Sequence, residues 1–289
     1  MEDQDVTGYL PANPYLTNIH LSLGRKNLTT NRIQMSTQLL KSNPTKVWGL
    51  TAVILFALSM VLNYGSLLIQ PVQDRGEGQI RTLVNPAGYA FSIWTLIFFA
   101  ILWASWRIFK YAGPPSQALY RATVALVFAA IANCLWVPVS FGGNQLLIML
   151  DLMANVLPLA IAYCYLVDFL ADAPKSYRSL LWPVSVFMGW TSVATIVTIA
   201  SFLQILGYNP DVLIAMTWAV ALTVVVLLLG LFFLYKNDIA FPLTLAWALV
   251  ALAVQHWWVE PLGYVYVSAS VLMVVAIAYQ RFVMKRAIR

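Results

Sequence analysis

The chain has 289 residues, of which 61% are hydrophobic and only 10% are charged, and its mean hydropathy is +0.77. A soluble domain carries roughly 25% charged residues, so this composition excludes an ordinary soluble protein and predicts an all-α, polytopic membrane helical bundle. The formal net charge is +6, but the basic residues stand between apolar runs, which argues against a nucleic-acid partner.

The first 46 residues are polar, with scattered Pro, Asn, Thr and Ser and no apolar core. They are predicted to form a disordered cytoplasmic tail rather than a signal peptide. Eight apolar runs follow, and each is long enough for the roughly 20 helical residues that cross a bilayer core. Their expected positions are 47–69, 88–109, 122–141, 146–170, 180–203, 211–234, 239–258 and 263–284.

The positions of the basic residues set the orientation of these spans. If the N-terminus is cytoplasmic, all but two of the 17 Lys and Arg residues fall on the cytoplasmic side. The two exceptions are Arg75 and Arg81, in the first outer loop. The positive-inside rule therefore predicts eight spans with both termini inside (N-in/C-in).

The second predicted span begins at an X-Pro step, Asn85-Pro86, followed closely by Gly88, which marks a helix start. An aromatic cluster that includes Trp94 lies just inside this start. Trp94, Trp136 and Trp190 are all well within predicted spans, so they cannot all belong to the aromatic belt at the membrane interface.

Asp151 is the clearest ionisable group inside a predicted span. It lies about five residues, or roughly 8 Å, into the fourth span, and Asn155 follows at i+4 on the same helix face. Two interpretations stay open: helix packing near the interface, or a polar contact in a ligand cavity or proton-linked site. Asn133, in the third span, is expected to be buried, where interhelical hydrogen bonding is the simpler role.

No catalytic motif is apparent, so the sequence predicts neither an enzyme nor catalytic residues. Cys134 and Cys164 lie inside apolar runs without zinc-type spacing, and there are only two histidines. No metal site and no resident cofactor are expected.

Three motifs carry a resemblance to the TspO/MBR family, the tryptophan-rich sensory proteins related to the mitochondrial translocator protein. The run Tyr89-Ala90-Phe91-Ser92-Ile93-Trp94-Thr95-Leu96-Ile97-Phe98 resembles the family's second helix, with Phe98 where the family usually has Tyr. Asn133-Cys134-Leu135-Trp136 is similar to its third-helix Asn-x-x-Trp, and Trp190 to Ala194 to its fifth-helix Trp-x-x-x-Ala. The resemblance covers residues 47–205. The remainder, 206–289, is predicted to be a three-helix membrane extension, as in the longer bacterial members.

The resemblance implies a five-helix bundle around a pocket for flat hydrophobic ligands, porphyrin-like or sterol-like. It implies that Trp94, Asn133, Trp190 and Ala194 line that pocket. Depth in the predicted spans adds Trp136, Asp151 and Asn155. Phe98 is a further candidate because it lies in the resemblance motif of the second helix. Arg75 and Arg81 are predicted to act as a lid that meets ligand carboxylates.

The leading hypothesis is therefore an integral, multi-pass membrane protein, in a bacterial inner membrane, that binds and transports or senses such ligands. Its expected partners are membrane lipid and the hydrophobic ligand, with a homodimer as a further arrangement and no nucleic acid. A proton-coupled secondary transporter that uses Asp151 is the alternative, and a membrane enzyme ranks last.

Overall fold

The computed structural model describes residues 44–69 and 82–284. The described residues form one compact unit. The predicted tail before residue 44 and the predicted lid residues Arg75 and Arg81 lie outside the described residues. Within those described ranges the secondary structure is helical throughout, which confirms the predicted all-α membrane bundle.

Eight helices account for most of the described chain. They are α2 (Pro44–Ile69), α3 (Ile93–Phe109), α4 (Gln117–Phe141), α5 (Gln145–Asp172), α6 (Leu181–Ile205), α7 (Val212–Tyr235), α8 (Ala240–Gln255) and α9 (Leu262–Tyr279). Three short helical turns adjoin them: η1 (Gly88–Ser92), η2 (Lys175–Leu180) and η3 (Gln280–Met284). Seven of the helical segments are long and apolar enough to cross a membrane, whereas α8 is apolar but has only 16 residues.

Side-chain caps fix several of the helix starts. The hydroxyl of Ser116 accepts a hydrogen bond from the Leu119 amide, so α4 begins at Gln117, five residues before the predicted span. The side chains of Asn144 and Asp211 cap α5 and α7 in the same way. These polar caps satisfy backbone amides that have no partner inside the helix. Hydropathy alone misses the first turn of α4 because that turn is polar.

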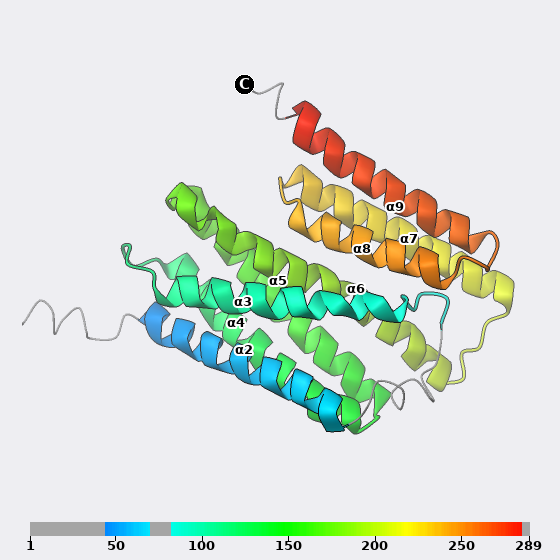
Figure 1. The fold of residues 1–289 in the computed structure, drawn as a ribbon, viewed down its shortest axis with the longest axis horizontal. Coiled ribbons are helices and arrows are strands. Elements are labelled where there is room, and N and C mark those ends of the chain that lie inside the picture. The colour runs from blue at the N-terminus through cyan, green and yellow to red at the C-terminus, as the bar shows by residue number, and fades with distance from the viewer. Residues whose placement is uncertain (1–43, 70–81, 285–289) are drawn as a thin grey trace, which may run out of the picture. The chain divides into compact units, whose positions relative to one another are not determined.

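Helices α2 to α6 close into a ring. Helix α2 packs against α3 and α4, α4 packs against α5, α5 against α6, and α6 returns to α3 (Figure 1). Every predicted binding residue that the structure describes lies on one of these helices. The ring is therefore the frame of any site that they form.

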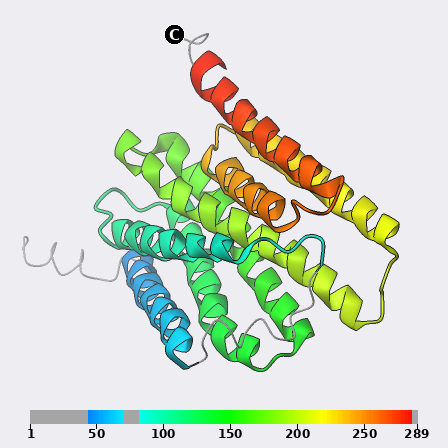
Figure 2. The same cartoon turned by 45° about the vertical axis from the view of Figure 1, so that its right-hand side comes forward.

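Helices α7, α8 and α9 form a second group that joins the ring through α8. Helix α8 packs against α6 and η1, while α7 and α9 pack against α8 and against each other (Figure 2). The contact with α6 is close at Gly189, where an added Cβ atom would lie 3.2 Å from the Cβ atom of Thr244. A glycine at this position thus lets α8 approach the turn of α6 that carries Trp190.

The helix ends separate into two levels. Two hydrogen bonds link segments near the helix ends at one level: Arg107 Nη2 donates to the Ser176 carbonyl over 3.2 Å, and Ser185 Oγ donates to an Asp238 carboxylate oxygen over 2.5 Å. We call this level the basic end and the opposite level the far end. Every Lys and Arg in the described ranges belongs to the basic end: Lys46, Arg107, Lys110, Arg121, Lys175, Arg178, Lys236 and Arg281.

Large apolar side chains cover much of the outer surface. Helix α7 is the most hydrophobic span and also the least buried, with Leu213 and Leu228 largely exposed. A soluble monomer rarely exposes apolar patches beyond a few hundred Å², so these faces are those that lipid chains contact in a bilayer.

Candidate functional site

An aromatic cluster joins α3 to α6 inside the ring. The Trp94 ring lies 5.6 Å from the Phe98 ring and 5.7 Å from the Phe187 ring, measured between centroids. The Trp190 ring meets the edge of Phe91, in η1, at 5.6 Å. Trp190 and Phe98 are each only 2% exposed. These are offset or edge-on geometries, which aromatic rings favour over face-to-face stacking.

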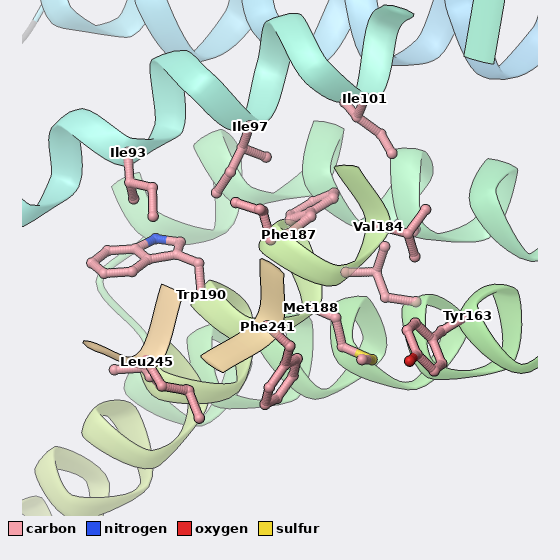
Figure 3. Close-up of a cluster of buried hydrophobic side chains, with 14 of the residues drawn as sticks. Ile93, Ile97, Ile101, Tyr163, Val184, Phe187, Met188, Trp190, Phe241 and Leu245 are labelled. Atoms are coloured by element: carbon pink, nitrogen blue, oxygen red, sulfur yellow. The ribbon is translucent and has the colours of Figure 1, made fainter. Parts of the chain in front are cut away.

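Helix α6 is enclosed by α3 on one side and α8 on the other. In Figure 3, Ile93 and Ile97 point from α3 towards Phe187 and Trp190, and the Trp190 indole nitrogen is turned towards Ile93. Leu245 approaches the opposite side of α6 from α8. The helix that carries Trp190 is therefore held from two sides. Ala194, one turn further along it, is half-buried.

Asn133 performs a structural task on α4. Its side-chain oxygen accepts a short hydrogen bond from the Ser59 hydroxyl of α2. One residue on, the Cys134 thiol donates to the Leu55 carbonyl over 3.3 Å. Asn133 thus ties α4 to α2, which is the simpler role expected from the sequence. Trp136 follows on the same helix and is half-buried.

Three of the predicted binding residues carry buried polar atoms without hydrogen-bond partners in the described chain. The atoms are Asp151 Oδ2, Asn155 Oδ1 and Trp190 Nε1. Asp151 is 8% exposed and Asn155 is 2% exposed, and both belong to the buried stripe of α5 that continues through Leu159. Leaving such an atom unpaired costs roughly 1–3 kcal/mol, so each is available to a partner that completes it.

Neither of two hollows in the described ranges is lined by a predicted binding residue. One, of about 30 Å³, lies among α6, α7, α8 and α9, has almost entirely apolar walls, and has room for about two water molecules. The other, of about 380 Å³, is an open groove between α4 and α5. The structure therefore does not gather the predicted residues around either hollow.

The segment that leads into α3, residues 82–92, is held by the C-terminal helices. The Tyr266 hydroxyl of α9 donates to the Leu83 carbonyl over 2.7 Å. His256, just after α8, lies 3.0 Å from the Asn85 carbonyl, and Nε2 must be the donor because a carbonyl only accepts. We call residues 82–92 the lead-in segment.

Two further hydrogen bonds attach the lead-in segment to α8. The Ala87 amide donates to the Ala251 carbonyl over 3.1 Å, and Trp247 Nε1 donates to the Ala90 carbonyl over 3.1 Å. The Trp247 ring also meets the edge of Tyr89 at 5.5 Å. The motif that begins the second span is thus fixed by helices more than 150 residues away in sequence.

Burial of His256 lowers its pKa, an effect that the hydrogen bond to the Asn85 carbonyl partly offsets. The folded protein consequently favours the neutral imidazole at this contact. At the basic end, burial and the neighbouring Tyr177 raise the pKa of Tyr111.

Sequence reasoning missed several residues that build the site. Phe187 touches Trp94, and the same ring meets Phe56 of α2 at 6.1 Å, but an isolated Phe in an apolar span carries no signal. Ser59 carries no sequence signal either, because Ser is common in membrane helices. Phe91 stands within the resemblance motif, so its contact with Trp190 was accessible from the family pattern.

The described residues contain no group of three or more His, Cys, Asp or Glu side chains placed to hold a metal ion. Cys134 and Cys164 are free thiols. The chemistry of the ring is therefore that of aromatic surfaces and a few hydrogen-bonding groups, which suits an apolar ligand with limited polarity.

Comparison with known proteins gives one family. A family model described as TSPO-like protein matches residues 47–280, which include the three C-terminal helices as well as the ring. No curated protein and no solved structure matches the chain significantly.

Proposed function

Because the chain belongs to the TSPO-like protein family, as a membrane protein of that type, we propose that it binds a flat hydrophobic ligand within the five-helix ring. The ligand is tetrapyrrole-like or sterol-like, and binding serves its transport or sensing rather than its chemical conversion. We place the protein in a bacterial inner membrane.

The observation that supports this most strongly is the set of unpaired atoms at Asp151, Asn155 and Trp190. Trp190 Nε1 is a donor and Asn155 Oδ1 an acceptor, so a ligand that pairs with both must carry an acceptor and a donor at separate positions. A tetrapyrrole does so, with pyrrole N–H groups and carboxylates on a flat apolar frame. A sterol combines donor and acceptor in a single hydroxyl group at one end, so it can pair at one position only.

The remaining predicted residues take supporting roles in this proposal. Trp94, Phe98 and Ala194 supply apolar wall, and Trp136 extends it on α4. Asn133 acts through α4 because its side chain is already bonded to Ser59. Arg75 and Arg81 remain proposed lid residues that pair with ligand carboxylates.

The test is a titration of the purified full-length protein in lipid nanodiscs with protoporphyrin and, separately, with a sterol. Trp190→Phe removes one hydrogen-bond donor and keeps an aromatic ring, so porphyrin affinity should fall about fivefold. Trp218→Phe is the matched control, because Trp218 lies exposed on α7 and donates to Tyr208 instead. The absence of saturable binding by either ligand would contradict the proposal, as would equal effects of the two substitutions.

One observation favours the alternative, a proton-coupled secondary transporter. Asp151 is buried with an unpaired carboxylate oxygen inside a span, where ionisable groups commonly mark a proton or ion path. In that case Asp151→Asn abolishes ligand flux in proteoliposomes while ligand binding is retained. Loss of binding and flux together would instead assign Asp151 to the ligand site.

A homodimer stays part of the proposal, with one restriction. Helix α8 already covers a face of α6, so a second copy has to use another surface. The oligomeric state in nanodiscs, measured by mass photometry, tests this point.

A further inference from the structure

The groove between α4 and α5 combines an apolar wall with a polar, charged end, as a binding site for an amphiphile requires. Its apolar walls include Phe128 of α4 and Pro158 and Ile161 of α5. Tyr120, Arg121 and Tyr165 stand at its basic end. Phe128 is 56% exposed and Ile161 is 42% exposed, so the groove opens on the outer surface of the ring, away from the proposed ligand site.

The depth of these residues matches the layers of a bilayer leaflet. Arg121 is four residues after the start of α4, roughly 6 Å along the helix, and Phe128 is roughly 10 Å deeper. A charge near the interface with apolar wall beneath it is the order in which a phospholipid presents its phosphate and its acyl chain. The groove volume of about 380 Å³ is within the range of small-ligand sites, which begins at roughly 300 Å³.

Arg121 is held beside an aromatic ring and has no counter-ion among the described residues. Its guanidinium group lies 5.5 Å from the centroid of the Tyr165 ring, and it forms no ion pair with the described carboxylates. Stacking on a ring orients the planar guanidinium group and leaves its N–H donors free for an anion. An arginine binds phosphate with two parallel hydrogen bonds, which a lysine cannot reproduce.

We propose that this groove binds one anionic phospholipid from the leaflet at the basic end, with its phosphate on Arg121 and an acyl chain against Phe128, Pro158 and Ile161. The charge complementarity selects an anionic headgroup, and the apolar wall selects a lipid over a soluble anion. The inference does not depend on the ligand proposed for the ring.

The experiment is native mass spectrometry of the full-length protein, released from detergent with phosphatidylglycerol or phosphatidylcholine added. The wild-type protein should retain one phosphatidylglycerol in preference to phosphatidylcholine. Arg121→Gln should reduce that retention by about tenfold, since a charge-assisted hydrogen-bonded contact is lost. Lys110→Gln is the matched control at the same end but outside the groove, and it should change retention by no more than about twofold.

A second variant separates the groove from general surface charge. Ile161→Trp fills the groove from an exposed position and leaves Arg121 intact, so retention should fall here too. Equal losses in Arg121→Gln and Lys110→Gln would overturn the proposal, because binding would then follow net charge alone. A second result would also overturn the proposal: the wild type is a dimer, and Ile161→Trp dissociates the dimer without changing lipid retention. The groove would then hold a second copy of the chain instead of a lipid.

Discussion

Asn133 and Asn155 are both buried inside the ring, but they differ in the hydrogen bonding of their side-chain oxygens. Both are 2% exposed, but only Asn133 has a partner for its side-chain oxygen, the Ser59 hydroxyl. The oxygen of Asn155 has none within the described chain. A buried amide oxygen left unpaired destabilises the ligand-free protein, and our proposal assigns that oxygen to the ligand.

This contrast predicts opposite effects of one substitution. Asn155→Leu should stabilise the ligand-free protein by about 1 kcal/mol and weaken porphyrin binding about tenfold, because it removes an unpaired acceptor that the ligand uses. Asn133→Leu should instead destabilise the protein by about 1 kcal/mol, since it leaves Ser59 without its acceptor. Thermal unfolding in nanodiscs, with and without ligand, measures both. A lower melting temperature for ligand-free Asn155→Leu would show that this amide is structural.

His256 predicts a pH effect on stability. Its folded-state pKa is lowered, so below about pH 6.5, the ordinary histidine value, the unfolded chain takes up a proton more readily than the folded protein. The contribution of His256 to the free energy of unfolding is therefore fully present above about pH 6.5. It is lost as the pH falls towards the lowered folded-state pKa. His256→Gln keeps a side-chain donor for the Asn85 carbonyl but does not titrate. Its melting temperature should therefore fall less than that of the wild type between pH 7 and pH 5, and identical slopes would exclude this role.

At the scale of elements, the C-terminal helices matter through the lead-in segment. Helices α8 and α9, together with His256 just after α8, supply four hydrogen bonds to it, at Leu83, Asn85, Ala87 and Ala90. That segment passes directly into η1 and α3, which carry Phe91 and Trp94. A consequence is that α8 and α9 set the position of one wall of the proposed ligand site.

Two tyrosines on α9 offer a matched test of this coupling. Tyr266→Phe removes the hydroxyl bonded to the Leu83 carbonyl, so hydrogen exchange in residues 82–92 should become faster, by about fivefold for a bond of about 1 kcal/mol. Tyr264→Phe removes only an exposed contact with Glu260 and should leave that exchange unchanged. Exchange measured by mass spectrometry on the peptide that contains Ala87 decides between them. Equal rates in both variants would mean that the lead-in segment is held without Tyr266.

Local sequence signals predicted most of the fold, because the hydropathy and the capping residues of each segment indicate its helix. The start of the sixth span at residue 211 and the helix start near Gly88 are examples. The contact between His256 and Asn85 left no such signal, since 171 residues separate the partners and neither is unusual in its own segment. The candidate site also has features that local sequence predicts and features that it does not. The deep positions of Trp94 and Trp190 follow from sequence, while the partner of Asn133 and the missing partner of Asn155 depend on how neighbouring helices rotate.

At the scale of the whole molecule, the separation of charge predicts how the bundle sits in a membrane. All described Lys and Arg residues gather at the basic end, as the positive-inside rule requires of a cytoplasmic face. This arrangement depends on α8 crossing the bilayer, although 16 residues extend only about 24 Å against a core of about 30 Å. Helix α8 is largely buried by α6, α7 and α9, so a short helix can cross there with little exposure to lipid.

Cysteine labelling tests that crossing directly. In a variant without Cys134 and Cys164, Trp258→Cys places a single thiol at an exposed position just after α8, and Tyr235→Cys places one at the exposed end of α7, before α8 begins. A membrane-impermeant maleimide should label Trp258→Cys in intact cells and Tyr235→Cys only after permeabilisation. Asn209→Cys and Pro115→Cys serve as references for the far end and the basic end. If Trp258→Cys and Tyr235→Cys respond alike, α8 does not cross, and α9 with its basic C-terminal residues would then lie in the opposite orientation to the one that the charge distribution predicts.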